Sequence, residues 1–389
     1  LLAVPRETFV PDIALEEVYR PSEAIVIKRL GGVSVSSASA PDVIATMLEQ
    51  LDPQPGGRVL EIGAGSGYNA ALLAHAVGPG GQVVTVDIDE DLVLAARAHL
   101  AEAGYRNVTV ILADGALGHA DAHGYDGIIL TVASRDIAPA WWAQLARPQG
   151  RLVMPLALRG VQRCVGFSLA TSSVETTGEY LVSQSLCTCS FIPLRGMLGM
   201  SAPRVPLDPQ GRCWLSTPDD DLPLPAEEIG DLLAGPLTIR PTGVSVSPGE
   251  LRQGLHLWLA MHQAHVYTVW GDWRIPDLFS QAERGLSRAT VCLIDADRRA
   301  VVLLAWSDED GRPFELKTLA SPKGGPLVAR LQDLLEGWVE AGRPGDAEAE
   351  IRAYAGGSGP HLAAGEVAIE RPWTRFVVGW RQPPASFTV

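Results

Sequence analysis

A glycine-rich turn directly after a short apolar segment limits this chain to few folds. Residues 58–62 read Arg-Val-Leu-Glu-Ile, and Gly63, Gly65 and Gly67 follow them. Glycine lets a backbone turn tightly and approach a ligand closely, and a helix that begins after such a turn offers free N–H groups to an anion. The dinucleotide-binding pattern G-x-G-x-x-G would need a third glycine where Tyr68 stands. A phosphate-binding loop would need a Gly-Lys-Ser or Gly-Lys-Thr ending, which this turn lacks.

Strand and helix patterns alternate from residue 42 to residue 155, as is typical of a parallel sheet covered on both faces. The predicted strands are 58–62, 82–87, 107–112, 126–131 and 151–155, and the predicted helices are 42–51, 68–77, 90–103 and 138–145. This pattern predicts an α/β fold, Rossmann-like and doubly wound. Ligands of such sheets bind beyond the carboxyl ends of the strands, where Gly63, Asp87, Asp114 and Thr131 fall.

The turn and the next strand end resemble S-adenosylmethionine-dependent methyltransferases, since residues 61–68 read E-I-G-A-G-S-G-Y and residues 86–87 read V-D. Five flanking motifs resemble those of protein-isoaspartate methyltransferases: A-V-P-R-E-T-F-V at 3–10, S-A-S-A-P at 37–41, A-D-G at 113–115, Y-D-G-I-I-L-T-V-A at 125–133 and F-I-P-L at 191–194. The resemblance covers about residues 1–196. It implies a carboxyl O-methyltransferase that uses S-adenosylmethionine and releases S-adenosylhomocysteine.

The resemblance also implies where the methyl donor binds. The glycine-rich turn would hold the amino-acid end of S-adenosylmethionine, Asp87 the ribose, and Asp114 with Gly115 the adenine edge. The implied donor-binding residues are Glu61, Gly63, Gly65, Gly67, Asp87, Ile88, Asp114 and Gly115. A carboxylate acceptor has an unperturbed pKa of about 4, so at neutral pH it needs no general base. The protein would mainly align the reacting atoms and exclude water.

On the acceptor side, Ser39 stands at the serine of the family's T-I-S-x-P segment, which implies that it directs the acceptor carboxylate. Ser36 and Ser37 are close competitors. Ser39 could instead only cap the helix that begins near Asp42. Asp42 departs from the family, because many members have histidine there. The implied substrate-binding residues are Ser37, Thr131, Ile192, Leu194 and Arg195.

The composition of the chain excludes several classes of binding partner. The net charge of −14 argues against a nucleic-acid or anionic-membrane partner. No apolar run approaches the length of a membrane span. Five cysteines without metal-ligand spacing favour a reduced, cytoplasmic setting and no metal. His262 and His265 have helical spacing, but they lack an acidic or cysteine partner at fixed spacing, which favours a structural role.

The second half of the chain carries none of these motifs. Residues 1–200 are predicted to form the methyltransferase domain, 201–248 a linker or irregular wrap, and 249–389 a smaller α+β domain. Its predicted helices are 249–266 and 325–341, and its predicted strands are 289–294, 300–306, 314–319, 348–354, 366–371 and 374–380. Most tryptophans lie beyond residue 200, where they serve either core packing or an aromatic peptide-binding surface.

The extended architecture resembles methyltransferases found with ribosomally made, modified peptides: lanthipeptides, lasso peptides and graspetides. That resemblance implies a precursor peptide, already macrocyclised, as the partner. An ordinary aspartate would be methylated, and its ester would cyclise to aspartimide and could open to isoaspartate. Two other functions stay open: general isoaspartate repair with an accessory domain, and methylation of a small carboxylic acid with the second domain as a dimerisation module.

Overall fold

The computed structural model describes residues 2–119, 124–171, 178–199, 204–208, 210–217, 222–271, 289–306, 312–356 and 359–381. The chain forms two compact units. Unit 1 comprises Leu1–Ala157, Gln162–Met200 and Glu350–Arg381, and unit 2 comprises Leu158–Val161, Ser201–Ala349 and Gln382–Val389. Unit 1 is therefore built from segments on both sides of residues 201–349 in the sequence.

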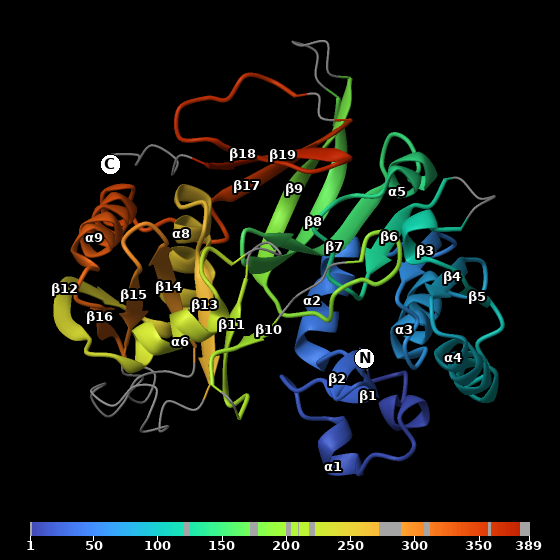
Figure 1. The fold of residues 1–389 in the computed structure, drawn as a ribbon. Coiled ribbons are helices and arrows are strands. Elements are labelled where there is room, and N and C mark those ends of the chain that lie inside the picture. Colours follow the sequence, from blue (N-terminus) through green and yellow to red (C-terminus); the bar gives the residue numbers. More distant parts are fainter. Residues whose placement is uncertain are drawn as a thin grey trace. The chain divides into compact units, whose positions relative to one another are not determined.

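Unit 1 contains a ten-stranded sheet with the order β18-β19-β17-β9-β8-β7-β6-β3-β4-β5 (Figure 1). Five strands on one side are parallel: β3 (Arg58–Ile62), β4 (Gln82–Asp87), β5 (Val108–Leu112), β6 (Gly127–Leu130) and β7 (Arg151–Leu158). The others are β8 (Val161–Thr171), β9 (Glu179–Thr188), β17 (Ala349–Ala355), β18 (Val367–Glu370) and β19 (Thr374–Trp380). The parallel part confirms the predicted α/β methyltransferase fold.

Helices pack on this sheet through their apolar residues. They are α2 (Pro41–Leu51), α3 (Tyr68–Val77), α4 (Glu90–Glu102) and α5 (Pro139–Gln144). Strands β3, β4 and β6 are buried almost throughout, which explains their continuous apolar runs. Before them come a 3₁₀ turn η1 (Arg6–Phe9), α1 (Leu15–Val18) and an antiparallel hairpin of β1 (Ile25–Leu30) and β2 (Val33–Ala38).

Unit 2 is built around a seven-stranded sheet with the order β10-β11-β13-β14-β15-β16-β12. Its strands are β10 (Arg204–Pro206), β11 (Cys213–Ser216), β12 (Thr238–Val246), β13 (Tyr267–Gly271), β14 (Ala289–Asp295), β15 (Ala300–Ala305) and β16 (Phe314–Ala320). Its helical segments are α6 (Ala226–Ala234), α7 (Pro248–Glu250), the π-helical turn η3 (Leu251–Leu255), α8 (His256–His262) and α9 (Gly325–Glu340).

Alternating residues of β15 enter two different cores of unit 2. Val302 and Leu304 join a cluster with α8 and α9, whereas Val301 and Leu303 join a cluster with α6. Because successive strand residues point to opposite faces, the sheet carries a hydrophobic core on each side. A sheet with helices on both faces has enough buried surface to form a unit of its own.

The structure divides the chain differently from the sequence prediction in two places. Residues 201–248, predicted as a linker, supply β10, β11, α6 and β12. Residues 349–380, predicted as part of the second domain, form β17, β18 and β19 of the ten-stranded sheet. The strand pairings in both places join residues far apart in sequence, so no local sequence pattern indicates them. In addition, the predicted helix 249–266 ends at His262.

Other expectations concern tryptophans, histidines and the membrane. Trp306 and Trp338 are buried in unit 2, while Trp270 is 42% exposed, so core packing accounts for part of the enrichment only. His262 stacks on Trp258 with ring centroids 3.8 Å apart, and its Nδ1 lies 2.9 Å from the Trp258 carbonyl. Among the described residues, no cluster of His, Cys, Asp and Glu is suited to a metal. No helix in the described ranges is both long and apolar enough to cross a membrane.

Candidate functional site

The glycine-rich turn between β3 and α3 forms one wall of the site. Gly63 and Gly67 have φ angles of +101° and +87°, in the left-handed region that favours glycine. A Cβ at Gly63 would lie 2.7 Å from Oγ1 of Thr131. Thr131 itself donates a 2.7 Å hydrogen bond to the Gly63 carbonyl. The residue after β6 therefore fixes the shape of the turn after β3.

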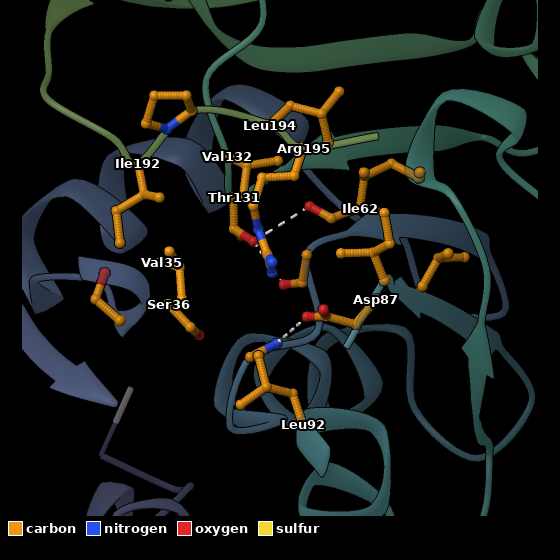
Figure 2. A pocket seen from close by; sticks show the side chains of 17 residues that line it. Val35, Ser36, Ile62, Asp87, Leu92, Thr131, Val132, Ile192, Leu194 and Arg195 are labelled. Carbon is orange, nitrogen blue, oxygen red and sulfur yellow. Dashed lines mark hydrogen bonds between the residues drawn. The ribbon is translucent and has the colours of Figure 1, made fainter. Parts of the chain in front are cut away.

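Asp87, at the end of β4, is held beside this turn. Its Oδ2 accepts from the Gly65 N–H at 3.0 Å (Figure 2). Its Oδ1 accepts from the Asp89 N–H at 3.1 Å. Burial raises the pKa of Asp87, and the two backbone donors partly oppose that rise. A carboxylate has about four lone-pair sites, so each oxygen can still accept a ribose hydroxyl.

An open pocket with about 560 Å³ of empty space, which includes space open to solvent, lies at these strand ends. Figure 2 shows Val35 and Ser36 on one side and Asp87 and Leu92 on another. Ten predicted residues line it: Ser37, Gly63, Gly65, Asp87, Ile88, Gly115, Thr131, Ile192, Leu194 and Arg195. Six further lining residues could not be predicted from the sequence, because their apolar side chains carry no chemical signal: Val35, Ile62, Val86, Leu92, Val132 and Pro193.

Ser39 does not line this pocket, whereas its two competitors Ser36 and Ser37 do. Helix α2 begins at Pro41 with Ala40 as its N-cap, and no side chain caps it. Ser39 is therefore not the cap either, and its backbone carbonyl accepts from the Arg6 guanidinium at 2.9 Å. The acceptor role of Ser39 stays a prediction, and Ser36 and Ser37 are better placed for it.

Glu61 and Gly67 also lie outside the pocket lining, and Glu61 is fully buried. The Glu61 carboxylate accepts from Asn69 Nδ2 at 2.7 Å and from Thr85 Oγ1 at 2.5 Å. Burial raises the pKa of Glu61 to about 7. In this structure Glu61 therefore ties α3 to β3 and β4 behind the glycine-rich turn, and the pocket lining gives no support to a donor contact.

Asp114, predicted at the adenine edge, is likewise outside the lining. Its Oδ1 accepts from the Ala116 N–H at 2.9 Å and its Oδ2 from the Met197 N–H at 2.7 Å. Asp114 thus caps the short 3₁₀ turn η2 (Gly115–Leu117) and holds residue 197 over it. Its neighbour Gly115 does line the pocket.

Residues 192–197, called the strap below, run across the carboxyl ends of the parallel strands. Two backbone hydrogen bonds of 2.9 and 2.8 Å join Ile192 and Leu194 to Ala133, which follows β6. Arg195 forms a two-pronged ion pair with Asp89 at 3.1 and 2.6 Å, next to the end of β4. Lys28 also contacts Asp89 at 3.0 Å. Burial alone would raise the pKa of Asp89, but hydrogen bonds from the two cations hold it below its usual value.

This geometry can be compared with known proteins. Residues 1–198 match the family model of protein-L-isoaspartate(D-aspartate) O-methyltransferase. The chain belongs to this family. The protein-L-isoaspartate O-methyltransferase of Methanopyrus kandleri is 36% identical over 205 residues, covering 52% of this chain and 84% of that protein. The enzyme of the same name from Staphylothermus marinus is 39% identical over 206 residues, covering 51% and 85%.

Two solved structures are also similar. A protein-L-isoaspartate O-methyltransferase aligns with a TM-score of 0.46 and 22% identity, covering 90% of this chain and 89% of that one. A Plasmodium falciparum family member in complex with S-adenosyl-L-homocysteine aligns with a TM-score of 0.41 and 19% identity, covering 50% and 87%. The present chain, as a member of this family, is an S-adenosylmethionine-dependent O-methyltransferase.

Proposed function

We propose that this enzyme transfers a methyl group from S-adenosylmethionine to the free α-carboxylate of L-isoaspartyl residues in peptides or proteins. Membership of the family supports this acceptor, since the curated relatives carry the name protein-L-isoaspartate O-methyltransferase. The observation that carries the proposal is that few ionisable side chains line the pocket. Among the described residues that line it, only Asp87 and Arg195 are ionisable, and both already have hydrogen-bond or ion-pair partners.

A pocket without a spare base suits an acceptor that is already a nucleophile. A carboxylate is ionised at neutral pH, whereas a hydroxyl or ammonium group would have to lose a proton first. One carboxylate oxygen bonds the methyl carbon while the carbon–sulfur bond breaks and its electron pair goes to sulfur. Either Ser36 or Ser37, whose side chains point to opposite faces of β2, can donate a hydrogen bond to the other oxygen and so orient the nucleophile. The strap would exclude water from the reacting atoms.

The test compares two synthetic peptides of identical sequence, one with isoaspartate and one with aspartate at the same position. With full-length enzyme and donor, mass spectrometry should show one added methyl group on the isoaspartyl peptide, followed by loss of methanol as a succinimide forms. The aspartyl peptide is the matched control and should stay unmodified. Methylation of the aspartyl peptide alone, or of neither peptide, would refute the proposal.

A second candidate acceptor is an ordinary aspartate in a macrocyclic precursor peptide. It is favoured by unit 2, which has its own cores and, apart from Leu158–Val161, lies outside the matched residues 1–198. In this proposal unit 2 recognises the macrocycle, whose constrained shape lowers the ordering cost of binding. The ester would then cyclise to aspartimide, which could open to isoaspartate. Methylation of a macrocyclic precursor, with its linear form and the isoaspartyl peptide left unmodified, would select this candidate.

A further inference from the structure

The N-terminal motif A-V-P-R-E-T-F-V contains a charged side chain that the proposed chemistry does not use. Arg6 is the first residue of η1 and is 0% exposed. Neighbouring residues of the same segment, Val4 and Phe9, are buried in the core cluster that also contains Tyr68. The motif therefore packs inside unit 1, next to the helix that follows the glycine-rich turn.

Arg6 contacts the segments that follow two walls of the pocket: the end of β2 and the start of α3. Its Nη2 donates to the carbonyls of Ala38 and Ser39 at 3.2 and 2.9 Å. These carbonyls come directly after Ser36 and Ser37, which line the pocket from β2. Its Cζ also lies 5.5 Å from the ring centroid of Tyr68, the first residue of α3.

This burial is costly for the fold. Nε and Nη1 of Arg6 are buried without a hydrogen-bond partner among the described residues. A buried cation whose donors are only partly satisfied destabilises a protein relative to an apolar side chain of similar size. Packing alone therefore does not explain an arginine at this position. Its two hydrogen bonds instead hold the end of β2, the strand whose Ser36 and Ser37 line the pocket.

We infer that Arg6 is a positioning residue for methyl transfer, which holds the serine-bearing end of β2 in register with the donor-binding turn. A misplacement of about 1 Å between reacting groups can cost roughly 100-fold in rate. Only Nη2 has partners, and a lysine ammonium can also bridge two carbonyls. Lysine should therefore replace Arg6 better than an uncharged side chain of similar length.

The test uses full-length Arg6→Met and Arg6→Lys. The control is Arg97→Met, because Arg97 also donates two bonds to a backbone carbonyl, that of Val110, away from the pocket lining. The turnover measurement rests on the proposed function, since it uses the isoaspartyl peptide. Arg6→Met should lower kcat about tenfold or more, with donor Kd within about twofold, whereas Arg6→Lys should recover most of the rate. Arg97→Met should keep the wild-type rate.

Amide hydrogen exchange tests the same inference without an acceptor. In Arg6→Met the amides of β2 should exchange at least about tenfold faster, while those of α3 keep their protection. If the wild-type enzyme leaves the isoaspartyl peptide unmodified, the proposed function fails. The amide exchange of β2 in Arg6→Met still tests whether Arg6 positions this strand. Unchanged exchange in β2 would overturn the inference. So would an equal loss of donor affinity and turnover, or an Arg6→Lys variant as slow as Arg6→Met.

Discussion

At the scale of single residues, several acidic side chains near the strand ends support the site from behind. Glu61 and Asp136 are buried and hydrogen-bonded to their neighbours, and burial raises the pKa of both. Asp114 uses both oxygens on backbone N–H groups. An acid at the end of a strand therefore indicates the place of a site, but only the structure tells which acids face the ligand. Among these acids, Asp87 is the one that lines the pocket.

Glu61 should make stability depend on pH near neutrality. Its folded-state pKa of about 7 lies above the ordinary value of 4.5, so the folded protein binds the proton more tightly. The stabilisation is complete below about pH 4.5 and is lost as pH rises through about 7, a change of about 3 kcal/mol. Glu61→Gln can keep the bonds to Asn69 and Thr85 without titrating.

The measurement is the free energy of unfolding by urea at several pH values. Between pH 5 and pH 7.5, wild type should lose about 2–3 kcal/mol relative to Glu61→Gln. Using the difference between the two proteins removes the contribution of the other titrating groups. A difference that stays constant over this range would show that Glu61 does not titrate there.

At the scale of elements, the strap gains its shape from contacts at both ends. Ala133 holds its start, Asp89 its middle and Asp114 its end. These three residues follow three different strands or strand ends of the parallel sheet. A segment without regular structure is thereby fixed beside the pocket, which Ile192 and Leu194 line.

The close approach of the strap to Asp114 depends on Gly196. This glycine has a φ angle of +90°, and a Cβ on it would lie 2.3 Å from the Asp114 carboxylate. Gly196→Ala must therefore displace the strap, and we expect donor affinity to fall about tenfold, or about 1.4 kcal/mol. Calorimetry with S-adenosylhomocysteine measures this.

Gly104→Ala is the matched control for that variant. Gly104 has a φ angle of +81°, but a Cβ there would meet nothing within 4 Å. Gly104→Ala therefore has the same backbone strain of an alanine in the left-handed region as Gly196→Ala, but no clash like the one with Asp114. Equal donor affinities in the two variants would mean that the strap does not shape the donor site.

At the scale of the whole molecule, unit 1 is completed by the end of the described chain. Strand β17 pairs with β9 through Arg352 with Val182 and Ala353 with Leu181. Asp136, which follows β6, accepts a hydrogen bond of 3.0 Å from the Trp373 N–H. The last three strands are therefore part of the methyltransferase sheet, and unit 2 is inserted between its segments.

Two shortened proteins test this organisation. A chain ending at residue 200 lacks β17–β19, which leaves the β9 edge unpaired and exposes the apolar surface that Phe376 and Val377 bury. We expect it to precipitate. A chain in which a Gly/Ser linker replaces residues 201–349 keeps those strands, so it should fold and bind S-adenosylhomocysteine like the full-length protein. Donor binding by the first protein and not the second would contradict this organisation.

The sequence predicted the parallel sheet because its signals are local. Each strand from β3 to β6 is a short apolar run, and the turn after β3 has glycines where left-handed backbone is needed. The strands β10 and β11 have three and four residues, and β12 contains Pro241 and Gly243, so all three read as loops. The membership of β17–β19 depends on pairing across more than 160 intervening residues, which periodicity cannot report.

The site was predictable to the same extent. Gly63, Asp87 and Thr131 follow the ends of parallel strands, which converge at one edge of a sheet, so their proximity follows from topology. Which of Ser36 and Ser39 lines the pocket depends on how β2 faces the turn, and the burial of Arg6 depends on the fold of the first forty residues. Neither is encoded in a local pattern, because both are settled by contacts with distant segments.

The insertion of unit 2 also sets an order of events on the ribosome. Synthesis runs from the N-terminus, so residues 201–349 emerge before the strands that complete the methyltransferase sheet. While they emerge, the nascent sheet presents β9 as an open edge, which is a template for pairing with other chains. Unit 2, whose described strands all lie within residues 204–320, can meanwhile fold without waiting for the C-terminus. Most of the catalytic unit is therefore translated first, but its sheet is completed only after residues 201–349 have been made.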